Sequence, residues 1–277
     1  MSALLFDFMM PAPAPAPEPA PEPQESLPCN ALRQLRASLD GTVAAKLMNA
    51  TELIHALERK RRDTVLPTTL DALDTLLGGG LPRGKMVELT GRRASGRFSV
   101  VLSALAAATS MGEAAVLIDV GDHFDPQLAE ENGVDLPRVL WVRPQTMKQA
   151  VMAAEMLAAT GFQLIVLDAG LAGFTKAGRR APDASWVRLA RAAEAHGTAL
   201  LISTPWPVTG TASEAVLVAE RTRTHWIGQG RSPRLLAGIT TDVRLEKHRH
   251  MKAGTRATLR FAMADSVDAT TGNTPRR

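Results

Sequence analysis

The sequence has no tyrosine, one cysteine and few aromatic residues. Aromatic side chains make up 4% of the 277 residues and hydrophobic ones 45%, so we expect a core of Ala, Leu, Val, Ile and Met. The lone Cys29 excludes an internal disulfide framework and is typical of a reducing cytoplasm. Residues 1–10 are apolar but too short for a membrane span, and they lack the basic region of a signal peptide. We therefore expect a cytoplasmic protein without a membrane partner.

Positive charge is absent from the first 28 residues, which contain four acids and no Lys or Arg. Because the whole chain has a net charge of +4, the other 249 residues carry +8. This excess favours a polyanionic partner, although the charge alone does not identify one.

The sequence predicts four segments. Residues 1–28 form a disordered Pro/Ala-rich tail that begins with the short apolar peptide ALLFDF, which is either a poorly ordered terminus or a docking motif. Residues 29–62 have a helical pattern of leucines, 63–265 form the main domain, and 266–277 form a second disordered tail.

The main domain alternates short apolar runs with helical segments. Helices are expected after Ser99, Thr146 and Ser185. The apolar runs cover residues 86–91, 114–120, 138–144, 163–170 and 198–204. Strands without polar alternation are buried on both faces, so this pattern predicts an α/β fold with a mostly parallel central sheet flanked by helices. Residues 235–250 and 255–264 are expected to add late antiparallel strands.

The stretch GRRASGRFS lies between the first of these strands and the first helix. Gly91 and Gly96 have the spacing of the phosphate-loop pattern G-x-x-x-x-G-K-[ST], and the strand–loop–helix context aims backbone N–H groups at an anion. The predicted phosphate-binding residues are Gly91, Arg92, Arg93, Ala94, Ser95, Gly96, Arg97, Phe98 and Ser99. A solvated basic turn is the alternative interpretation of the three arginines.

The departures from the phosphate-loop pattern affect the predicted Mg²⁺ site more than the predicted anion site. Arg97 keeps the charge of the expected lysine, but a flat guanidinium does not replace a slim ammonium between phosphates. Phe98 removes the hydroxyl that binds Mg²⁺, and Ser99 is rotated by about 100° around the helix. Asp168, at the end of the strand LIVLD, occupies the place of the metal-orienting acid. The sequence thus predicts an anion site for ATP with an impaired Mg²⁺ site.

The segment LPTTLDALDTLLGGGLPRGKMVELTGRRASGRFS, continued by FDP and GVDLPRVL, resembles the core of the bacterial RecA recombinase family from about Leu66 to Phe261. The resemblance implies a RecA-like phosphate-loop core. It also implies that the catalytic Glu of the family is replaced by Gly121, with Asp122 beside it, and that Thr204-Pro205-Trp206-Pro207 replaces the γ-phosphate-sensing Gln. Efficient ATP hydrolysis is therefore not expected.

The same resemblance implies further site residues. Asp125 corresponds to an adenine contact, with a helix N-cap as the alternative. Lys247 and Arg249 match a Lys-x-Lys pair that reaches the nucleotide of a neighbouring subunit. The DNA-binding loops are rewritten as TKAGRRAPDA and VTGTASEA. Independently of the resemblance, Arg188 and Arg191 lie three apart on one predicted helix face and Arg179 and Arg180 lead into it, which indicates either backbone-phosphate contact or ordinary solvation.

The combination of a RecA-like core, a variable N-terminal helical region and degenerate nucleotide motifs resembles the ImuA family. This resemblance implies an SOS-induced DNA-damage adaptor in mutagenic translesion synthesis. Its implied partners are single-stranded DNA, an ImuB-type inactive Y-family polymerase, an error-prone polymerase, and another copy of the chain or RecA. The alternative is an ATP-dependent recombinase or recombination mediator. A cell-division inhibitor is a third reading that nothing in the sequence selects. No metal site is expected, since His248 and His250 have no other ligand cluster beside them.

Overall fold

The computed structural model describes Gln34, Ala37, Ser38, Ile54 and residues 64–170, 181–228 and 234–262. The chain divides into two compact units, Met1–Leu57 and Glu58–Arg277. In the first unit the four described residues are helical and exposed. Most of the predicted 29–62 helical region and both predicted tails lie outside the described residues, so those segment boundaries stay predictions.

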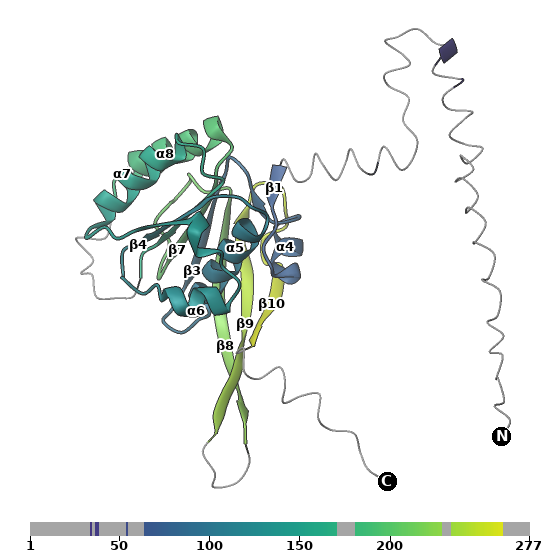
Figure 1. The fold of residues 1–277 in the computed structure, drawn as a ribbon, viewed down its shortest axis with the longest axis vertical. Helices are drawn as coiled ribbons and strands as arrows, with labels where there is room; N and C mark the ends of the chain where they lie inside the picture. The colour runs from purple at the N-terminus through teal and green to yellow at the C-terminus, as the bar shows by residue number, and fades with distance from the viewer. Residues whose placement is uncertain are drawn as a thin grey trace, which may run out of the picture. The chain divides into compact units, whose positions relative to one another are not determined.

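The second unit is built on an eight-stranded sheet with the order β10-β9-β8-β3-β7-β6-β4-β5 (Figure 1). The strands from β8 to β5 in this order are parallel, whereas β8–β9 and β9–β10 are antiparallel. Their bounds are β3 Met86–Gly91, β4 Ala115–Asp119, β5 Val139–Val142, β6 Leu164–Asp168, β7 Ala199–Thr204, β8 Ala215–Ile227, β9 Leu235–His248 and β10 Arg256–Ala262. A separate antiparallel pair joins β1 (Val65–Leu66) to β2 (Leu81–Pro82).

Helices cover both faces of the parallel part of the sheet. The helices are α4 Asp71–Leu76, α5 Arg97–Ser110, α6 Pro126–Glu131, α7 Met147–Ala158 and α8 Asp183–His196, with a 3-10 turn η1 at Leu136–Arg138. One hydrophobic cluster joins α4, α5 and α6 to the sheet, and another joins α7 and α8 to it. Along β4, Leu117 belongs to the first cluster while Val116 and Ile118 belong to the second, because successive strand residues face opposite sides. Both faces are therefore apolar, as the sequence predicts.

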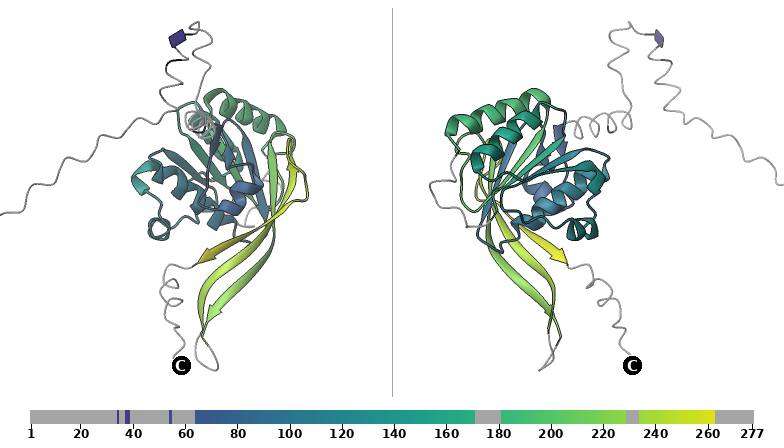
Figure 2. Two further views of the ribbon diagram at one scale, coloured as in Figure 1. Left: turned by 90° about the vertical axis from the view of Figure 1, so that its right-hand side faces the viewer. Right: turned by 60° about the vertical axis from the view of Figure 1, so that its left-hand side comes forward.

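The predicted fold class is confirmed, with one omission. β8 is 13 residues long and was not expected from the sequence after Trp206. β3 pairs only with Ala215–Ala219 of β8, and the rest of β8 pairs only with β9, so the two strands project as a ribbon beyond the sheet (Figure 2). Residues 223–227 of this ribbon are exposed. A strand exposed on both faces has no apolar alternation, so the pattern did not indicate this distal part, whereas Ala215–Ala219 is an apolar run that the sequence analysis passed over.

Candidate functional site

The phosphate loop connects β3 to α5 at the carboxyl edge of the parallel strands. Gly96 is the N-cap of α5 and has a left-handed backbone with φ 81°. A Cβ atom at this position would lie 2.6 Å from Oγ1 of Thr241 in β9. Glycine is thus required both by the backbone conformation and by the approach of the neighbouring strand.

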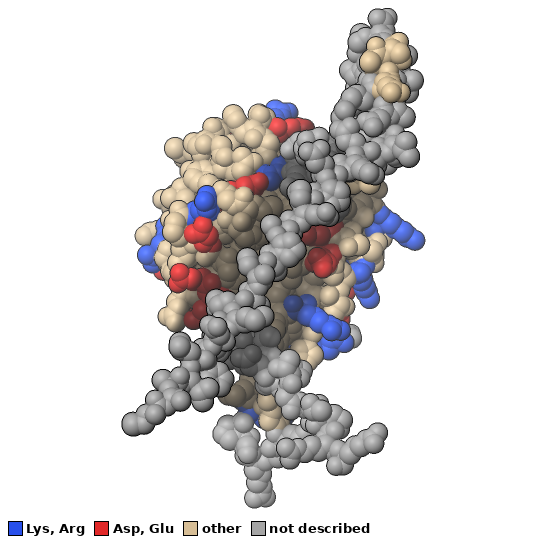
Figure 3. All heavy atoms as spheres, turned by 45° about the vertical axis from the view of Figure 1, so that its right-hand side comes forward, with Lys and Arg blue, Asp and Glu red and all other residues tan. Residues whose placement is uncertain are grey.

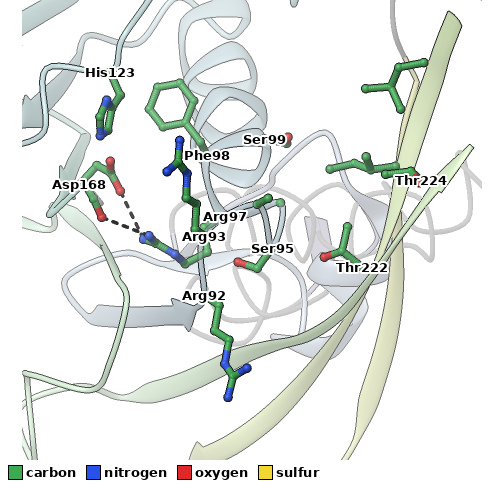
Figure 4. A pocket seen from close by; sticks show the side chains of 15 residues that line it. Arg92, Arg93, Ser95, Arg97, Phe98, Ser99, His123, Asp168, Thr222 and Thr224 are labelled. Carbon is green, nitrogen blue, oxygen red and sulfur yellow. Dashed lines mark hydrogen bonds and ion pairs between the residues drawn. The ribbon is translucent and has the colours of Figure 1, made fainter. Parts of the chain in front are cut away.

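A pocket of about 480 Å³ opens beside the loop (Figure 4). It is lined by the predicted loop residues from Arg92 to Ser99 and by Asp168. The remaining lining residues are His123, Gly170, Thr222, Thr224, Leu236 and Ile239. The last four come from the β8–β9 ribbon. The sequence analysis did not predict these four residues, because no sequence motif indicates that a hairpin distant in sequence lines the pocket.

Arg97 is turned into the carboxyl edge of the sheet, with only 6% of the residue exposed. Its Nη1 donates to Oγ of Ser203 at 2.7 Å and lies 3.5 Å from Oδ1 of Asp168. Its Nη2 donates to the carbonyl oxygen of Gly170 at 3.2 Å. Figure 4 shows the guanidinium directed at Asp168, whereas Arg92 points the opposite way. Arg97 therefore cross-links α5 to the ends of β6 and β7.

Both members of the Arg97–Asp168 pair are largely buried. Burial raises the pKa of the Asp168 carboxyl, and the hydrogen bond from Ser203 and the charge of Arg97 oppose that rise. Burial likewise lowers the pKa of Arg97, against the effect of Asp168. A guanidinium keeps its proton in proteins because its ordinary pKa is above about 12. The cation that Asp168 faces is accordingly an arginine of the same chain.

The residues at the expected magnesium position do not fit the ion. Mg²⁺ requires oxygen ligands, and Phe98 supplies none where the pattern has a hydroxyl. The carboxylate of Asp168 is already paired with Arg97. Within the described ranges, no group of three or more His, Cys, Asp or Glu residues is arranged to hold a metal ion. An internal ion pair thus occupies the carboxylate at which the sequence predicts an impaired metal site, and the impairment itself stays a prediction.

Gly121, which the resemblance aligns with the catalytic Glu, has no room for a side chain. A Cβ atom there would lie 2.6 Å from Cδ2 of His123 and 2.8 Å from Cα of Gly170. The neighbouring Asp122 is held by Arg143, whose Nε and Nη2 donate to the two carboxylate oxygens at 2.7 and 2.5 Å. These hydrogen bonds lower the pKa of Asp122. Neither position presents a free carboxylate that would activate a water molecule.

Introducing a side chain at Gly121 should therefore destabilise the domain without creating an ATPase. We expect Gly121→Ala to lower the free energy of unfolding by about 1–3 kcal/mol, because the backbone of Gly170 does not give way as a side chain would. Gly121→Glu should cost more and show no turnover of Mg-ATP. Urea unfolding and a phosphate-release assay measure the two effects.

A His123→Ala background separates the two contacts of the introduced methyl group. This background removes the contact with the His123 ring but keeps the contact with the Gly170 backbone, so part of the loss in unfolding free energy caused by Gly121→Ala should remain. A Gly121→Ala variant as stable as the parent chain would contradict the steric argument.

Glu88, in β3, is a buried carboxylate that the sequence analysis did not single out. Its Oε1 accepts from the backbone N–H of Val208 at 2.6 Å and of Thr209 at 3.3 Å, and its Oε2 accepts from Oγ1 of Thr209 at 2.6 Å. The residue is fully buried. Glu88 thus fixes the segment after β7, where the resemblance predicts the γ-phosphate sensor and the second DNA loop.

The same segment is anchored from β9 and the turn after it. Nζ of Lys247 donates to the carbonyl oxygens of Gly210 at 3.2 Å and Ser213 at 2.9 Å. Nε of Arg249 lies 3.4 Å from Oε2 of Glu214. Both residues that the resemblance assigns to a subunit interface therefore contact their own chain, and the interface itself stays a prediction.

The sequence profile described as the RecA N-terminal domain matches residues 31–181, more than half of the chain. The chain belongs to the RecA N-terminal domain family. It is 42% identical over 113 residues to Protein RecA of Nocardia farcinica, a stretch covering 40% of this chain and 33% of that protein. The match to Protein RecA of Mycobacterium avium is 41% identical over 113 residues and covers 40% of this chain and 32% of that protein. The matched stretch thus spans about a third of these RecA proteins.

The crystal structure of the RadB recombinase resembles this RecA-family chain in fold. The TM-score is 0.51 at 21% identity, and the superposition covers 70% of this chain and 94% of that one. In the part of the RecA-family chain that the structure describes, no helix is both long and apolar enough to span a bilayer.

The remaining predicted residues of this RecA-family chain are dispersed. Asp125 does not line the pocket. Its Oδ1 accepts from the N–H groups of Gln127 at 3.0 Å and Leu128 at 3.3 Å, which matches the N-cap alternative. Arg188 makes a two-point ion pair with Glu155, 3.1 Å for each contact. Arg191 is exposed on α8. Arg179 and Arg180 lie outside the described residues, so DNA contact by this group stays a prediction.

Proposed function

We propose that this RecA-family chain is a DNA-binding adaptor that does not hydrolyse ATP efficiently. The observation that carries the proposal is the engagement of Arg97 with Asp168, Ser203 and Gly170, which leaves the metal-orienting acid without a place for Mg²⁺. The closed position at Gly121 supports it independently, since no carboxylate fits where water would be activated.

Single-stranded DNA is the proposed nucleic-acid partner, and its binding should not depend on ATP. A RecA-type switch would require the segment after β7 to rearrange when the γ-phosphate binds. Here Glu88 holds Val208 and Thr209, and Lys247 holds Gly210 and Ser213. Because these contacts already hold the segment to β3 and β9, we expect ATP to order little of it.

The finer assignment is to the ImuA type. Support comes from the degenerate phosphate loop, the changed Gly121 position and the additional N-terminal segment ahead of the core. On this proposal the chain acts in the SOS response and mutagenic translesion synthesis. It would join DNA to an inactive ImuB-type Y-family polymerase and an error-prone polymerase, with self-association or RecA contact as further interactions. The apolar peptide at residues 3–8, on its proline spacer, suits such recruitment.

Binding of the full chain to labelled single-stranded DNA across a salt series, with and without Mg-ATP, tests the proposal. We expect the logarithm of the binding constant to fall linearly with the logarithm of the salt concentration, because phosphate contacts release counterions. The two series should coincide, and phosphate release should stay at background. Binding that appears only with Mg-ATP, or a robust Mg²⁺-dependent ATPase, would contradict the proposal.

A matched pair of variants tests where DNA contacts the chain. Arg191 on α8 and Lys148 on α7 are both exposed cations, but only Arg191 belongs to the predicted DNA-binding group. We expect Arg191→Ala to reduce the magnitude of the salt slope by about 1, and Lys148→Ala to leave it unchanged. Equal effects of the two substitutions would indicate general electrostatic attraction rather than a site.

An ATP-dependent recombinase or recombination mediator is the second candidate. It is favoured by membership of the RecA family and by a loop that still joins β3 to α5 with both pattern glycines, Gly91 and Gly96, in place. Filaments that form on DNA only with Mg-ATP, seen by electron microscopy, would select this candidate over the adaptor.

A further inference from the structure

β8 has a free edge along the part of the β8–β9 ribbon that extends beyond the sheet (Figure 2). β3 pairs with β8 only as far as Ala219, and among the described strands residues 221–227 of β8 pair with β9 alone. In a strand with one neighbour, every second residue turns its backbone N–H and C=O groups away from that neighbour. Residues 221–227 therefore present a row of donors and acceptors that lack a partner among the described residues.

The end of the ribbon is apolar on both faces. Trp226 pairs with Leu236 and is 53% exposed. Ile227 pairs with Leu235, which is 70% exposed. Because neighbouring residues of a strand point to opposite faces, the two pairs lie on opposite sides of the ribbon. Nε1 of Trp226 donates to Oγ1 of Thr224 at 3.0 Å, which holds the indole along the strand. An exposed edge strand with apolar side chains is a place where another polypeptide adds.

The charge of this stretch has one sign. Residues 221–241 contain four arginines and one histidine but no Asp or Glu. A groove of about 780 Å³ on one face of the ribbon is lined by Arg223, His225 and Arg260, and its described lining includes no carboxylate. Arg223 reaches Asp242 at 3.1 Å, yet 57% of its side chain is exposed. At the lower end of the view in Figure 3, the described surface of the ribbon is blue and tan without red. An acidic partner is therefore favoured over a second copy, which would bring two positive ribbons together.

The free edge of β8 favours a polypeptide over a nucleic acid. Its outward backbone groups are donors and acceptors in alternation, and a polypeptide strand offers both kinds at the same spacing. A nucleic-acid backbone offers phosphate acceptors, so the outward carbonyl groups of β8 would stay without a donor. The side chains of β8 also alternate, with Arg223 and His225 on one face and Thr224 and Trp226 on the other. A strand that pairs with this edge is thus complementary when its acidic and apolar residues alternate.

We propose that the free edge of β8 binds an extended segment of a partner protein as an additional strand, and that this segment has alternating acidic and apolar residues. Its acids lie beside Arg223 and His225, and its apolar residues lie beside Trp226. The added strand turns the two-stranded part of the ribbon, which is marginally stable by itself, into a three-stranded sheet. The inference goes beyond the proposed function and does not depend on how the phosphate loop interacts with ATP.

Fluorescence anisotropy of the labelled heptapeptide VEVEVEV, titrated with the full chain, tests this inference. We expect VEVEVEV to bind and the charge-reversed heptapeptide VKVKVKV not to bind. Hydrogen exchange of the β8 amides, measured by NMR, then distinguishes strand pairing from charge attraction. Binding as a strand should slow the exchange of alternate amides within residues 221–227, which are the amides that face away from β9.

Two charge reversals of equal size show whether the peptide binds at the ribbon. Arg223→Glu places an acid beside the acids of the peptide and should weaken binding about tenfold. Lys148→Glu makes the same change of charge at an exposed position of α7 and should leave binding unchanged. Trp226→Ala should also weaken binding, through the lost apolar contact. Arg223 and Trp226 are both exposed, so these substitutions remove no buried contact of the core.

Three results would overturn the inference. The first is failure of VEVEVEV to bind, or binding that leaves the exchange of residues 221–227 unchanged. The second is stoichiometric displacement of the peptide by single-stranded DNA, because the ribbon would then be a nucleic-acid surface. The third is a dimer in sedimentation that Trp226→Ala dissociates, because a second copy would then cover the edge. The proposed function is tested separately, by the Mg-ATP dependence of DNA binding and by phosphate release.

Discussion

Replacement of Arg97 by Met should lower the free energy of unfolding by about 3–5 kcal/mol, because it leaves the carboxylate of Asp168 buried without its cation. Asp168 is 3% exposed, and among the described residues Arg97 is the cation that acts on it. The substitution also removes the donors that bond to Ser203 and Gly170. Urea or thermal unfolding of the variant measures the loss.

The loss of unfolding free energy in Arg97→Met should grow as the pH rises. Burial already raises the pKa of Asp168 in the folded chain, and removal of Arg97 raises it further. Between the unfolded and folded values the folded state binds more protons than the unfolded state, so stability falls as pH rises through this range. The Arg97→Met variant should thus be less stable at neutral pH and recover part of its loss as the pH falls through the raised pKa of Asp168.

The partner substitution provides the control. Combining Arg97→Met with Asp168→Leu removes both charges, and we expect the double variant to be more stable than Arg97→Met alone, because an apolar pair has no desolvation penalty. A double-mutant cycle gives the coupling free energy of the two residues. An Arg97→Met variant as stable as the parent chain at all pH values would contradict the stabilising role of the ion pair.

Replacement of Glu88 by Ala should destabilise the chain by about 2–5 kcal/mol and release the segment after β7. The carboxylate accepts from the N–H groups of Val208 and Thr209 and from the hydroxyl of Thr209, and each buried donor that loses its acceptor costs about 1–3 kcal/mol. Hydrogen exchange of the Val208 and Thr209 amides reports the release directly. Both amides should exchange much faster in the variant, while amides of β6 should change only with global stability.

Glu88→Gln is the matched control because it keeps the shape of the side chain. Its amide oxygen still accepts from the two backbone N–H groups, and the hydroxyl of Thr209 rotates to accept from the amide NH₂. The segment should stay protected. Protection that is equal in the parent, Gln and Ala chains would show that Glu88 does not fix this segment.

The parallel part of the fold was predictable because its strands are buried on both faces. β4 and β7 are fully buried along their length and appear in the sequence as the apolar runs VLID and ALLIS. The distal half of β8 was not predicted. It is exposed to solvent and pairs with β9. Hydrophobic periodicity indicates which residues are buried, so it does not identify a strand whose side chains are mostly exposed.

The loop was predictable as an anion site, but the direction of Arg97 was not. Its partners Gly170 and Ser203 lie 73 and 106 residues away in sequence. Glu88 is similar, since it occupies an ordinary strand position and its partner Val208 is 120 residues later. Contacts of this range are set by the order of strands in the sheet, which no local motif encodes.

The central place of β3 has a consequence for how this chain folds as it is synthesised. Val87 pairs with Leu201 on one side and Ala215 on the other, so both neighbours of β3 are made more than a hundred residues after it. Closing such long loops is slow, and an unpaired apolar strand is prone to aggregation in the meantime. The first hydrophobic cluster also includes Val243, Leu245 and Leu259, so the domain completes its core only after β10 has left the ribosome.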